Sequence, residues 1–143
     1  MAVVAAYLRG IANLPIWLIG TSRGTESAAS LAIRLQDSID GVIPTSSITV
    51  KNQRGTNILD LPLQRIRVPA LVMAHVNDSC FVTPPWQDER IIDALANAPR
   101  RQLAKMEGGL PARAESCEAL SAHGYYGIEP AAVEAMWRFL TAR

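Results

Sequence analysis

Three residues of this chain have the types that nucleophilic catalysis requires. Ser22 lies in the stretch GTSRG, Asp78 in HVNDSCFVTPP and His123 in SAHGYYGIE. A serine hydroxyl is a weak nucleophile at neutral pH, so it needs a neighbouring base and a third group that fixes the tautomer of that base. We therefore predict that Ser22 is the nucleophile, His123 the general base and Asp78 the acid that orients it.

Two glycines flank the serine and favour a tight turn at this point. Gly20 and Gly24 lie two residues before and after Ser22. Residues without Cβ relieve the crowding that arises where a strand turns abruptly into a helix. The helix that follows would direct its N-terminus at the site, which favours developing negative charge. In the alternative interpretation the turn carries no chemistry, Asp78 is a turn residue and His123 lies in a surface loop.

A zinc site is the other chemistry that these residue types allow. His75, Cys80, Cys117 and His123 could ligate a metal, but their separations do not resemble those of compact zinc modules. His75 lies within an apolar stretch, so we expect it to be a packed core residue. The chain contains neither G-x-G-x-x-G nor G-K-[ST], and we expect no metal and no cofactor.

The order of the expected elements indicates how these residues come together. Apolar spacing predicts helices and strands in alternation, which favours an α/β fold with a parallel sheet of about four strands and helices on both faces. Ser22, Asp78 and His123 each follow a different strand, so we expect them at the same carboxyl edge of the sheet. The helices are expected at residues 2–11, 25–35, 86–96 and from Pro130 onward, and the strands at 16–19, 41–43, 70–76 and 102–106, with Pro44 ending the second strand and a polar loop continuing through Asn57.

The overall composition is that of a globular domain. The 143 residues fit a single domain spanning 1–143, with 49% hydrophobic and 19% charged residues and a formal net charge of +1. This charge does not indicate a nucleic-acid partner. Arg9 and Arg34 interrupt the most aliphatic regions, so we expect no membrane span.

The three quoted stretches resemble the nucleophile elbow, the acid loop and the histidine loop of the α/β-hydrolase fold superfamily. The resemblance covers nearly the whole chain and is specific to the fold and the triad, and Val82 and Pro84 after Asp78 match the family loosely. It implies a serine hydrolase that acts on an ester or related small acyl substrate without a cofactor. It also implies that the backbone N–H of Arg23 is one donor of the oxyanion hole.

The chain resembles only the C-terminal half of that fold. Family members usually have several strands and a helix before the elbow strand, and a loop there supplies the second oxyanion donor. Here the strand at 16–19 becomes an edge, and exposed apolar edges invite pairing with another chain. We expect a homodimer, or a missing N-terminal segment, to cover it. The alternative function is a catalytically silent half-domain that serves as an assembly or binding module.

The two cysteines lie beside two of the proposed catalytic residues. Cys80 follows Asp78 by two residues, and Cys117 precedes His123 by six. If the triad forms, their loops are neighbours, and we predict a Cys80–Cys117 disulfide, with two reduced thiols as the alternative. A disulfide would suggest an exported protein, and free thiols a cytoplasmic one.

Several residues near these loops allow both a functional and a structural interpretation. The Arg23 side chain could bind a substrate carboxylate or pair with Glu26. The aromatic residues could line an acyl pocket or pack in the core, and the hydroxyl residues could reach the cleft or only form a turn. These residues are Trp86, Tyr125 and Tyr126 in the first group and Thr45, Ser46 and Ser47 in the second.

Overall fold

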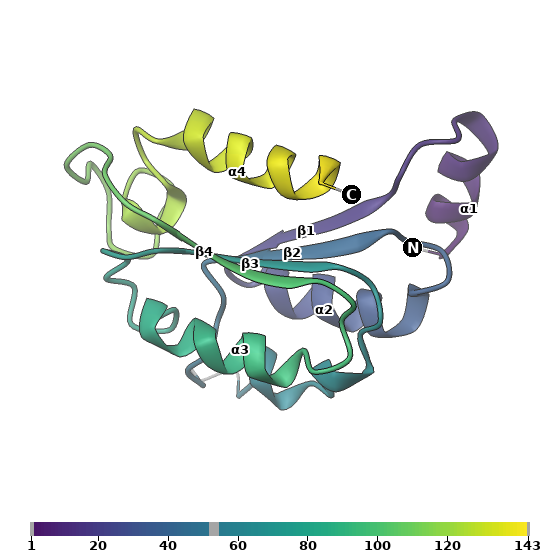
Figure 1. The fold of residues 1–143 in the computed structure, drawn as a ribbon. Helices are drawn as coiled ribbons and strands as arrows, with labels where there is room; N and C mark the ends of the chain where they lie inside the picture. Colours follow the sequence, from purple (N-terminus) through teal and green to yellow (C-terminus); the bar gives the residue numbers. More distant parts are fainter. Residues whose placement is uncertain (1, 52–54, 143) are drawn as a thin grey trace.

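The computed structural model describes residues 2–51 and 55–142 and contains a parallel four-stranded sheet between layers of helices (Figure 1). The strands are β1 (Trp17–Thr21), β2 (Gly41–Thr45), β3 (Ala70–His75) and β4 (Arg101–Met106), in the order β1-β2-β3-β4. Helices α2 (Gly24–Leu35) and α3 (Asp88–Ala94) cover one face, and α4 (Glu129–Thr141) covers the other (Figure 1). The predicted fold class is confirmed, because each strand pairs in parallel with the next.

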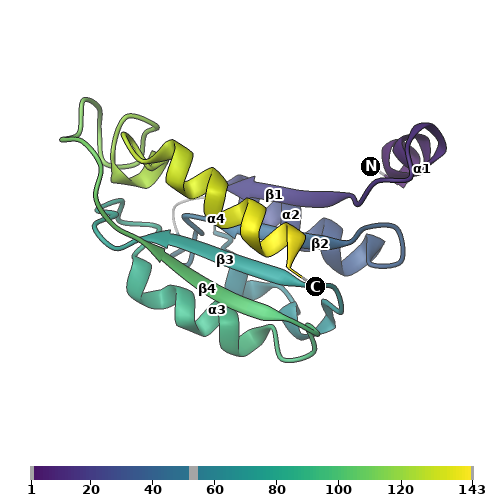
Figure 2. The same ribbon diagram turned by 45° about the horizontal axis from the view of Figure 1, so that its top comes forward.

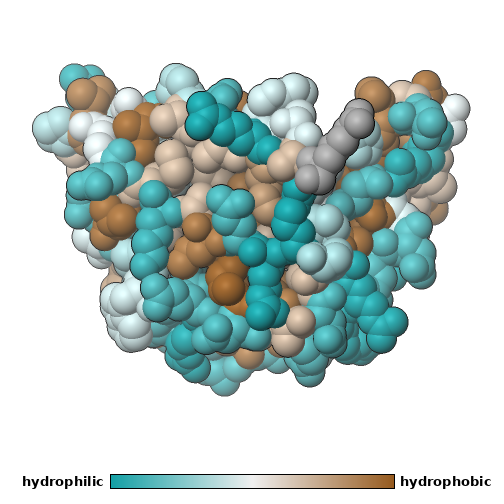
Figure 3. All heavy atoms as spheres, viewed as in Figure 1, coloured by the Kyte–Doolittle hydropathy of each residue, from teal (hydrophilic) through white to brown (hydrophobic). Residues whose placement is uncertain are grey.

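The first helix, α1 (Ala2–Ile11), lies apart from the two helical layers (Figure 2). Its apolar side chains are largely exposed, with 81% of Val3, 65% of Tyr7 and 63% of Ile11 accessible. Figure 3 shows hydrophobic atoms at the upper right of the molecule, where α1 lies. Arg9 is paired with Asp40, which also accepts a hydrogen bond from the amide of Ile16. None of the described helices is long and apolar enough to cross a membrane.

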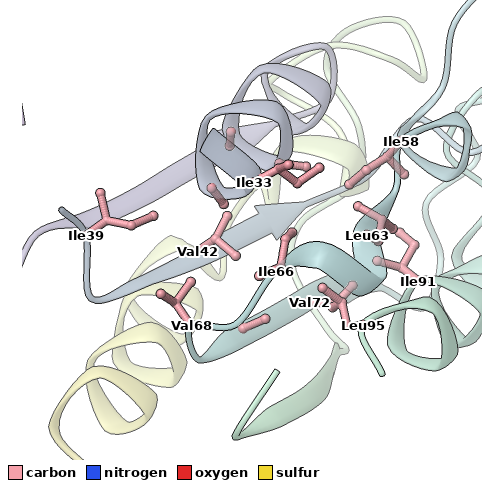
Figure 4. Packing of buried hydrophobic residues seen from close by; sticks show 14 residues of the cluster. Ile33, Ile39, Val42, Ile58, Leu63, Ile66, Val68, Val72, Ile91 and Leu95 are labelled. Atoms are coloured by element: carbon pink, nitrogen blue, oxygen red, sulfur yellow. The ribbon is translucent and has the colours of Figure 1, made fainter. Parts of the chain in front are cut away.

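The larger core lies between the sheet and helices α2 and α3 (Figure 4). Alanines at positions 28, 29 and 32 of α2 are almost fully buried, so the helix backbone approaches the sheet closely. Burying an aliphatic side chain contributes about 1.5–3 kcal/mol. The sheet contributes the fully buried side chains of Val42 and Val72, α3 that of Ile91, and the residue after α3 that of Leu95.

A second core lies under α4, on the opposite face of the sheet. Phe139 of α4 packs with Ile43, Leu71 and Met73 from the two central strands. The ring of Trp17 meets Phe139 edge to face, with 5.8 Å between the ring centroids. This contact joins β1 to α4 and is one of the arrangements that aromatic pairs favour.

Several predicted boundaries differ from the structure. The first strand begins at Trp17 rather than at residue 16 and continues to Thr21. The predicted helix at 86–96 consists of a 3-10 turn at Pro85–Gln87 followed by α3. Within the predicted polar loop, residues 52–54 lie outside the described residues.

The prediction that Pro44 ends the second strand is wrong, because Pro44 lies inside β2. The amides of Val42 and Ser46 donate toward β3 at 3.0 and 2.9 Å. Pro44 lies between them and has no N–H to donate. The sheet accommodates this loss, and registered pairs lie on both sides of it: Val42 with Ala70, and Thr45 with Met73.

Candidate active site

The turn after β1 has the strained geometry expected of a nucleophile elbow. Ser22 follows the strand directly and has a φ of 52°, in the left-handed region. This conformation costs a non-glycine residue roughly 1–2 kcal/mol. The Ser22 amide donates to the carbonyl oxygen of Thr45 at 3.0 Å, and its own carbonyl oxygen accepts from the Thr25 amide at 3.0 Å. Hydrogen bonds on both sides therefore hold the serine backbone in this turn.

The two flanking glycines have different roles. A Cβ atom at Gly20 would lie 2.3 Å from the carbonyl oxygen of Gly24 and 2.8 Å from the Cβ of Ala28. The strand and helix can therefore approach this closely only with glycine at position 20. A Cβ atom at Gly24 would meet no atom within 4 Å, so the predicted crowding occurs at Gly20 and not at Gly24.

The residue after the serine presents a free backbone amide. Arg23 precedes the first residue of α2, where helical N–H groups lack carbonyl partners. Among the hydrogen bonds of the described residues, none uses the Arg23 amide. The side chain of Arg23 is exposed and, within the described part of the chain, forms no ion pair with Glu26. The amide is therefore available to a negatively charged oxygen next to Ser22.

Asp78 and His123 form a buried pair, although they are 45 residues apart in the sequence. Nδ1 of His123 lies 2.9 Å from Oδ2 of Asp78. Only 4% and 1% of their side chains are exposed, respectively. The loop after β3 and the loop before α4 thus meet through these two side chains, as a carboxylate that orients an imidazole requires.

Two further groups donate to the Asp78 carboxylate. The amide of Cys80 donates to Oδ1 at 2.9 Å, and the hydroxyl of Thr83 donates to Oδ2 at 2.9 Å. Hydrogen bonds of this kind offset the cost of burying a carboxylate. The Thr83 hydroxyl is also 3.1 Å from Nδ1 of His123. Sequence analysis did not identify Thr83, and its only signal was a hydroxyl five residues after the proposed acid.

The backbone of His123 is held from two sides. The Ser121 hydroxyl oxygen accepts from the His123 amide at 3.2 Å and caps the short 3-10 helix Ala122–Gly124. From the neighbouring strand, the Ser46 hydroxyl donates to the His123 carbonyl oxygen at 2.8 Å. Ser46 also has a left-handed φ, of 45°. Of the hydroxyl residues after β2, Ser46 is therefore the one that reaches the proposed base.

Ser22 and Ser46 follow adjacent strands at the same level of the sheet. Thr21 pairs with Thr45 in the register of β1 and β2, so the next residue of each strand is a serine in a left-handed turn. Because the Ser46 hydroxyl bonds to the backbone carbonyl of His123, the His123 backbone lies next to the end of β2, the strand that neighbours β1. Within the described residues, Ser22 is half-buried and forms no hydrogen bond with His123. Catalytic hydrogen bonds often tighten only when substrate is bound.

The predicted disulfide is present. Cys80 and Cys117 are bonded at an S–S distance of 2.08 Å and join the acid loop to the base loop. Their sulfurs are thus not free to ligate zinc. The Nε2 atom of His75 lies 2.9 Å from the carbonyl oxygen of Gly108, and this residue is buried as predicted. No three His, Cys, Asp or Glu side chains of the described residues are grouped to hold a metal ion.

Asp88 is a second buried carboxyl group near Asp78 that sequence analysis did not identify. Burial and the negative charge of Asp78 raise the pKa of Asp88 and Lys105 lowers it, which together bring this pKa to about 8. Within the described residues, Oδ1 of Asp88 has no hydrogen-bond partner. A carboxyl group in this setting keeps its proton at neutral pH.

The three aromatic residues near the site differ in burial. Tyr125 is a core residue whose hydroxyl donates to the carbonyl oxygen of Met73 at 3.1 Å, and burial raises its pKa to about 12. Tyr126 is half-buried, whereas 70% of Trp86 is exposed. The structural interpretation therefore holds for Tyr125, and Trp86 presents an apolar ring to solvent.

Solved structures with the same fold include known hydrolases. A metagenome-derived lipolytic enzyme is 12% identical, with a TM-score of 0.68 over 96% of this chain and 69% of that chain. A serine hydrolase homologue from Coxiella burnetii is 16% identical, with a TM-score of 0.56 over 96% of this chain and 55% of that chain. A monoacylglycerol lipase from Paleococcus ferrophilus is 14% identical, with a TM-score of 0.53 over 74% of this chain and 63% of that chain.

These likenesses concern structure rather than sequence. No protein-family model matches the chain, and no curated protein matches it significantly. The matched region spans only 55–69% of the three solved chains. The chain therefore has the fold of the α/β-hydrolases and corresponds to part of such a domain.

Proposed function

We propose that the chain is a serine hydrolase that acts on an ester or related acyl substrate through Ser22, His123 and Asp78. The observation that carries the proposal is the buried His123–Asp78 pair at the edge of the sheet where Ser22 adopts a left-handed turn. Asp78 follows β3 and Ser22 follows β1, so only β2 lies between them. Two of the structural relatives are described as lipolytic, which supports an acyl substrate.

The proposed reaction begins with proton transfer from Ser22 to His123. Nε2 of His123 takes the hydroxyl proton while Oγ of Ser22 attacks the substrate carbonyl carbon, and the carbonyl oxygen becomes an oxyanion. The Arg23 amide donates to that oxygen, and the dipole at the N-terminus of α2 favours its negative charge. Asp78 keeps the proton of the imidazole on Nδ1 and stabilises the imidazolium ion.

The remaining steps return the enzyme to its resting state. When the tetrahedral intermediate collapses, the bond to the leaving oxygen breaks and His123 gives that oxygen its proton. Water then attacks the acyl-serine ester, again with His123 as base. The bond between the acyl carbon and Oγ of Ser22 breaks, His123 returns its proton to Oγ, and the acid is released. Only one oxyanion donor is assigned, and removing one such donor lowers kcat by about 10²- to 10³-fold in serine hydrolases. We therefore expect acylation with slow turnover.

A fluorophosphonate probe tests the proposal, because it bonds only to an activated serine. We expect intact-mass analysis to show one added probe on the folded wild type and none on Ser22→Ala. Ser27→Ala removes an exposed hydroxyl from α2, the helix that follows Ser22, and should label like wild type. Labelling that survives in Ser22→Ala would contradict the proposed nucleophile.

A second candidate function is a silent half-domain that serves as an assembly module. The exposed apolar side chains of α1 and the open edge of β1 favour it. A folded wild type that gains no probe at any concentration would support this function over the hydrolase.

A further inference from the structure

Thr83 places a buried hydroxyl against both members of the His123–Asp78 pair. The residue is 1% exposed, and its Oγ1 atom lies 2.9 Å from Oδ2 of Asp78 and 3.1 Å from Nδ1 of His123. With the 2.9 Å between Nδ1 and Oδ2, the three atoms form a closed triangle. A hydroxyl in this position contacts the ring nitrogen whose proton determines the tautomer.

One arrangement of protons satisfies the hydrogen-bonding groups of Asp78, Thr83 and His123 together. An ionised carboxylate only accepts, and a threonine hydroxyl has a single proton. Asp78 is best satisfied when both Thr83 and Nδ1 of His123 donate to Oδ2. The lone pairs of Thr83 then face the Nδ1 proton, and Nε2 is left without a proton. This is the tautomer in which His123 can accept the Ser22 proton.

The local backbone holds the Thr83 hydroxyl in place. Its amide donates to the carbonyl oxygen of Cys80 at 3.1 Å, and Pro84 follows it. The amides of Thr49 and Val50 donate to the preceding carbonyl, of Val82, at 3.0 and 3.2 Å. The side chain therefore needs little rearrangement to act on the imidazole.

From this geometry we propose that Thr83 is a positioning residue, which shares Oδ2 of Asp78 with His123 and so fixes the place of the Nδ1-protonated imidazole. The proposal rests on the proposed hydrolase function. Thr83 acts through His123 and does not itself touch substrate.

Thr83→Val and Thr83→Ser test the proposal through the pH profile. Thr83→Val removes a hydrogen bond to a charged group. The free energy of such a bond corresponds to a fall in kcat of about 10- to 100-fold, and we expect KM to change little. Without the Thr83 donor, Oδ2 is left to the imidazole alone and stabilises its protonated form more, so the acid limb of kcat/KM moves to higher pH. Thr83→Ser keeps the hydroxyl and should retain the wild-type profile.

Ser46→Ala is the matched comparison, because it removes another buried hydroxyl bonded to His123, at the backbone carbonyl. We expect it to lower the melting temperature without moving the acid limb. A Thr83→Val protein with the kcat and acid limb of wild type would overturn the positioning role, even if Ser22 is confirmed as the nucleophile.

Nitrogen-15 NMR of the His123 ring separates this proposal from the hydrolase function, since it requires no turnover. We expect a protonated Nδ1 in the wild type and in Thr83→Ser, and ring-nitrogen signals that differ from those of wild type in Thr83→Val. Identical His123 titrations in wild type and Thr83→Val would refute the proposal whether or not the protein hydrolyses esters.

Discussion

The two edges of the sheet are built in opposite ways. Strand β4 has polar, exposed side chains along its edge, and its Lys105 is paired with Glu89 at 2.8 Å. Strand β1 has the sequence WLIGT, and 54% of its Ile19 side chain is exposed. Charged residues, especially lysine, prevent edge strands from pairing with other chains. The contrast between a charged and an apolar edge is the reason for our proposal that another polypeptide covers β1 and not β4.

The half of the sheet formed by β1 and β2 and the half formed by β3 and β4 also differ in how their loops are held. After β3 and before α4, the loops are joined by the disulfide and by the His123–Asp78 pair. The exposed helix α1 beside β1 is attached to the rest of the molecule through an extended segment and the Arg9–Asp40 pair (Figure 2). The proposed base and acid therefore lie on the crosslinked side of the sheet, at β3 and β4, which we call the locked side. The proposed nucleophile lies on the side of β1 and β2, which we call the open side.

Removing the disulfide should have the largest effect on this contrast. In the chain-entropy model, a crosslink with a sequence separation of 37 residues stabilises the fold by about 3–4 kcal/mol. We expect Cys80→Ala combined with Cys117→Ser to lose that amount of unfolding free energy in urea titrations. Hydrogen exchange should speed up in the loop at 107–121 and remain unchanged in α2. A reducing agent serves as the control, because it should destabilise wild type and not the variant.

The buried carboxyl group of Asp88 should make the free energy of unfolding depend on pH. Its pKa is about 8 in the folded protein and 3.8 as a free side chain, so between these values the folded state holds a proton that the unfolded state has lost. Stability from this group is therefore greatest below pH 4 and falls as the pH rises toward 8.

Asp88→Asn should remove this slope and should be more stable than wild type at pH 8. The exposed Asp93→Asn is the matched control and should follow the wild-type curve. Unfolding free energies measured from pH 4 to pH 8 that run parallel for Asp88→Asn and wild type would contradict the buried, protonated carboxyl group.

A charge on the open edge should change association while leaving stability nearly unaltered. We predict that the wild type is a homodimer through β1 at micromolar concentration and that Ile19→Lys is a monomer, as measured by sedimentation velocity. Because Ile19 is half-exposed, its replacement should change the unfolding free energy by no more than about 0.5 kcal/mol. Gln102→Lys on the β4 edge is the control and should sediment like wild type. A monomeric wild type would refute the homodimer.

The fold could be predicted because local patterns and tertiary packing agree along most of the chain. Apolar runs bounded by glycine or proline marked the first three strands, and the alanines of α2 marked a helix that packs closely. Pro44 misled the prediction, since a proline usually ends a strand, whereas here its neighbours supply the remaining hydrogen bonds of β2.

The site was predictable only where a residue type is rare or part of a motif. Ser22, Asp78 and His123 occur in stretches that resemble those of a known fold, and the cysteines followed from their neighbours. Thr83 and Ser46 gave no comparable signal, because hydroxyl residues are common in turns. The burial of Asp88 depends on how the chain packs around α3, which spacing in the sequence does not reveal.

The missing amide of Pro44 has a consequence for the sheet as a whole. It removes one rung from the ladder between β2 and β3, which is the boundary between the open and the locked sides. The spacing between the Ser22 turn and the Asp78 loop is therefore set across the pair of strands, β2 and β3, whose ladder lacks this hydrogen bond. Side-chain packing on the two faces, rather than an unbroken backbone ladder, must keep the two sides in alignment.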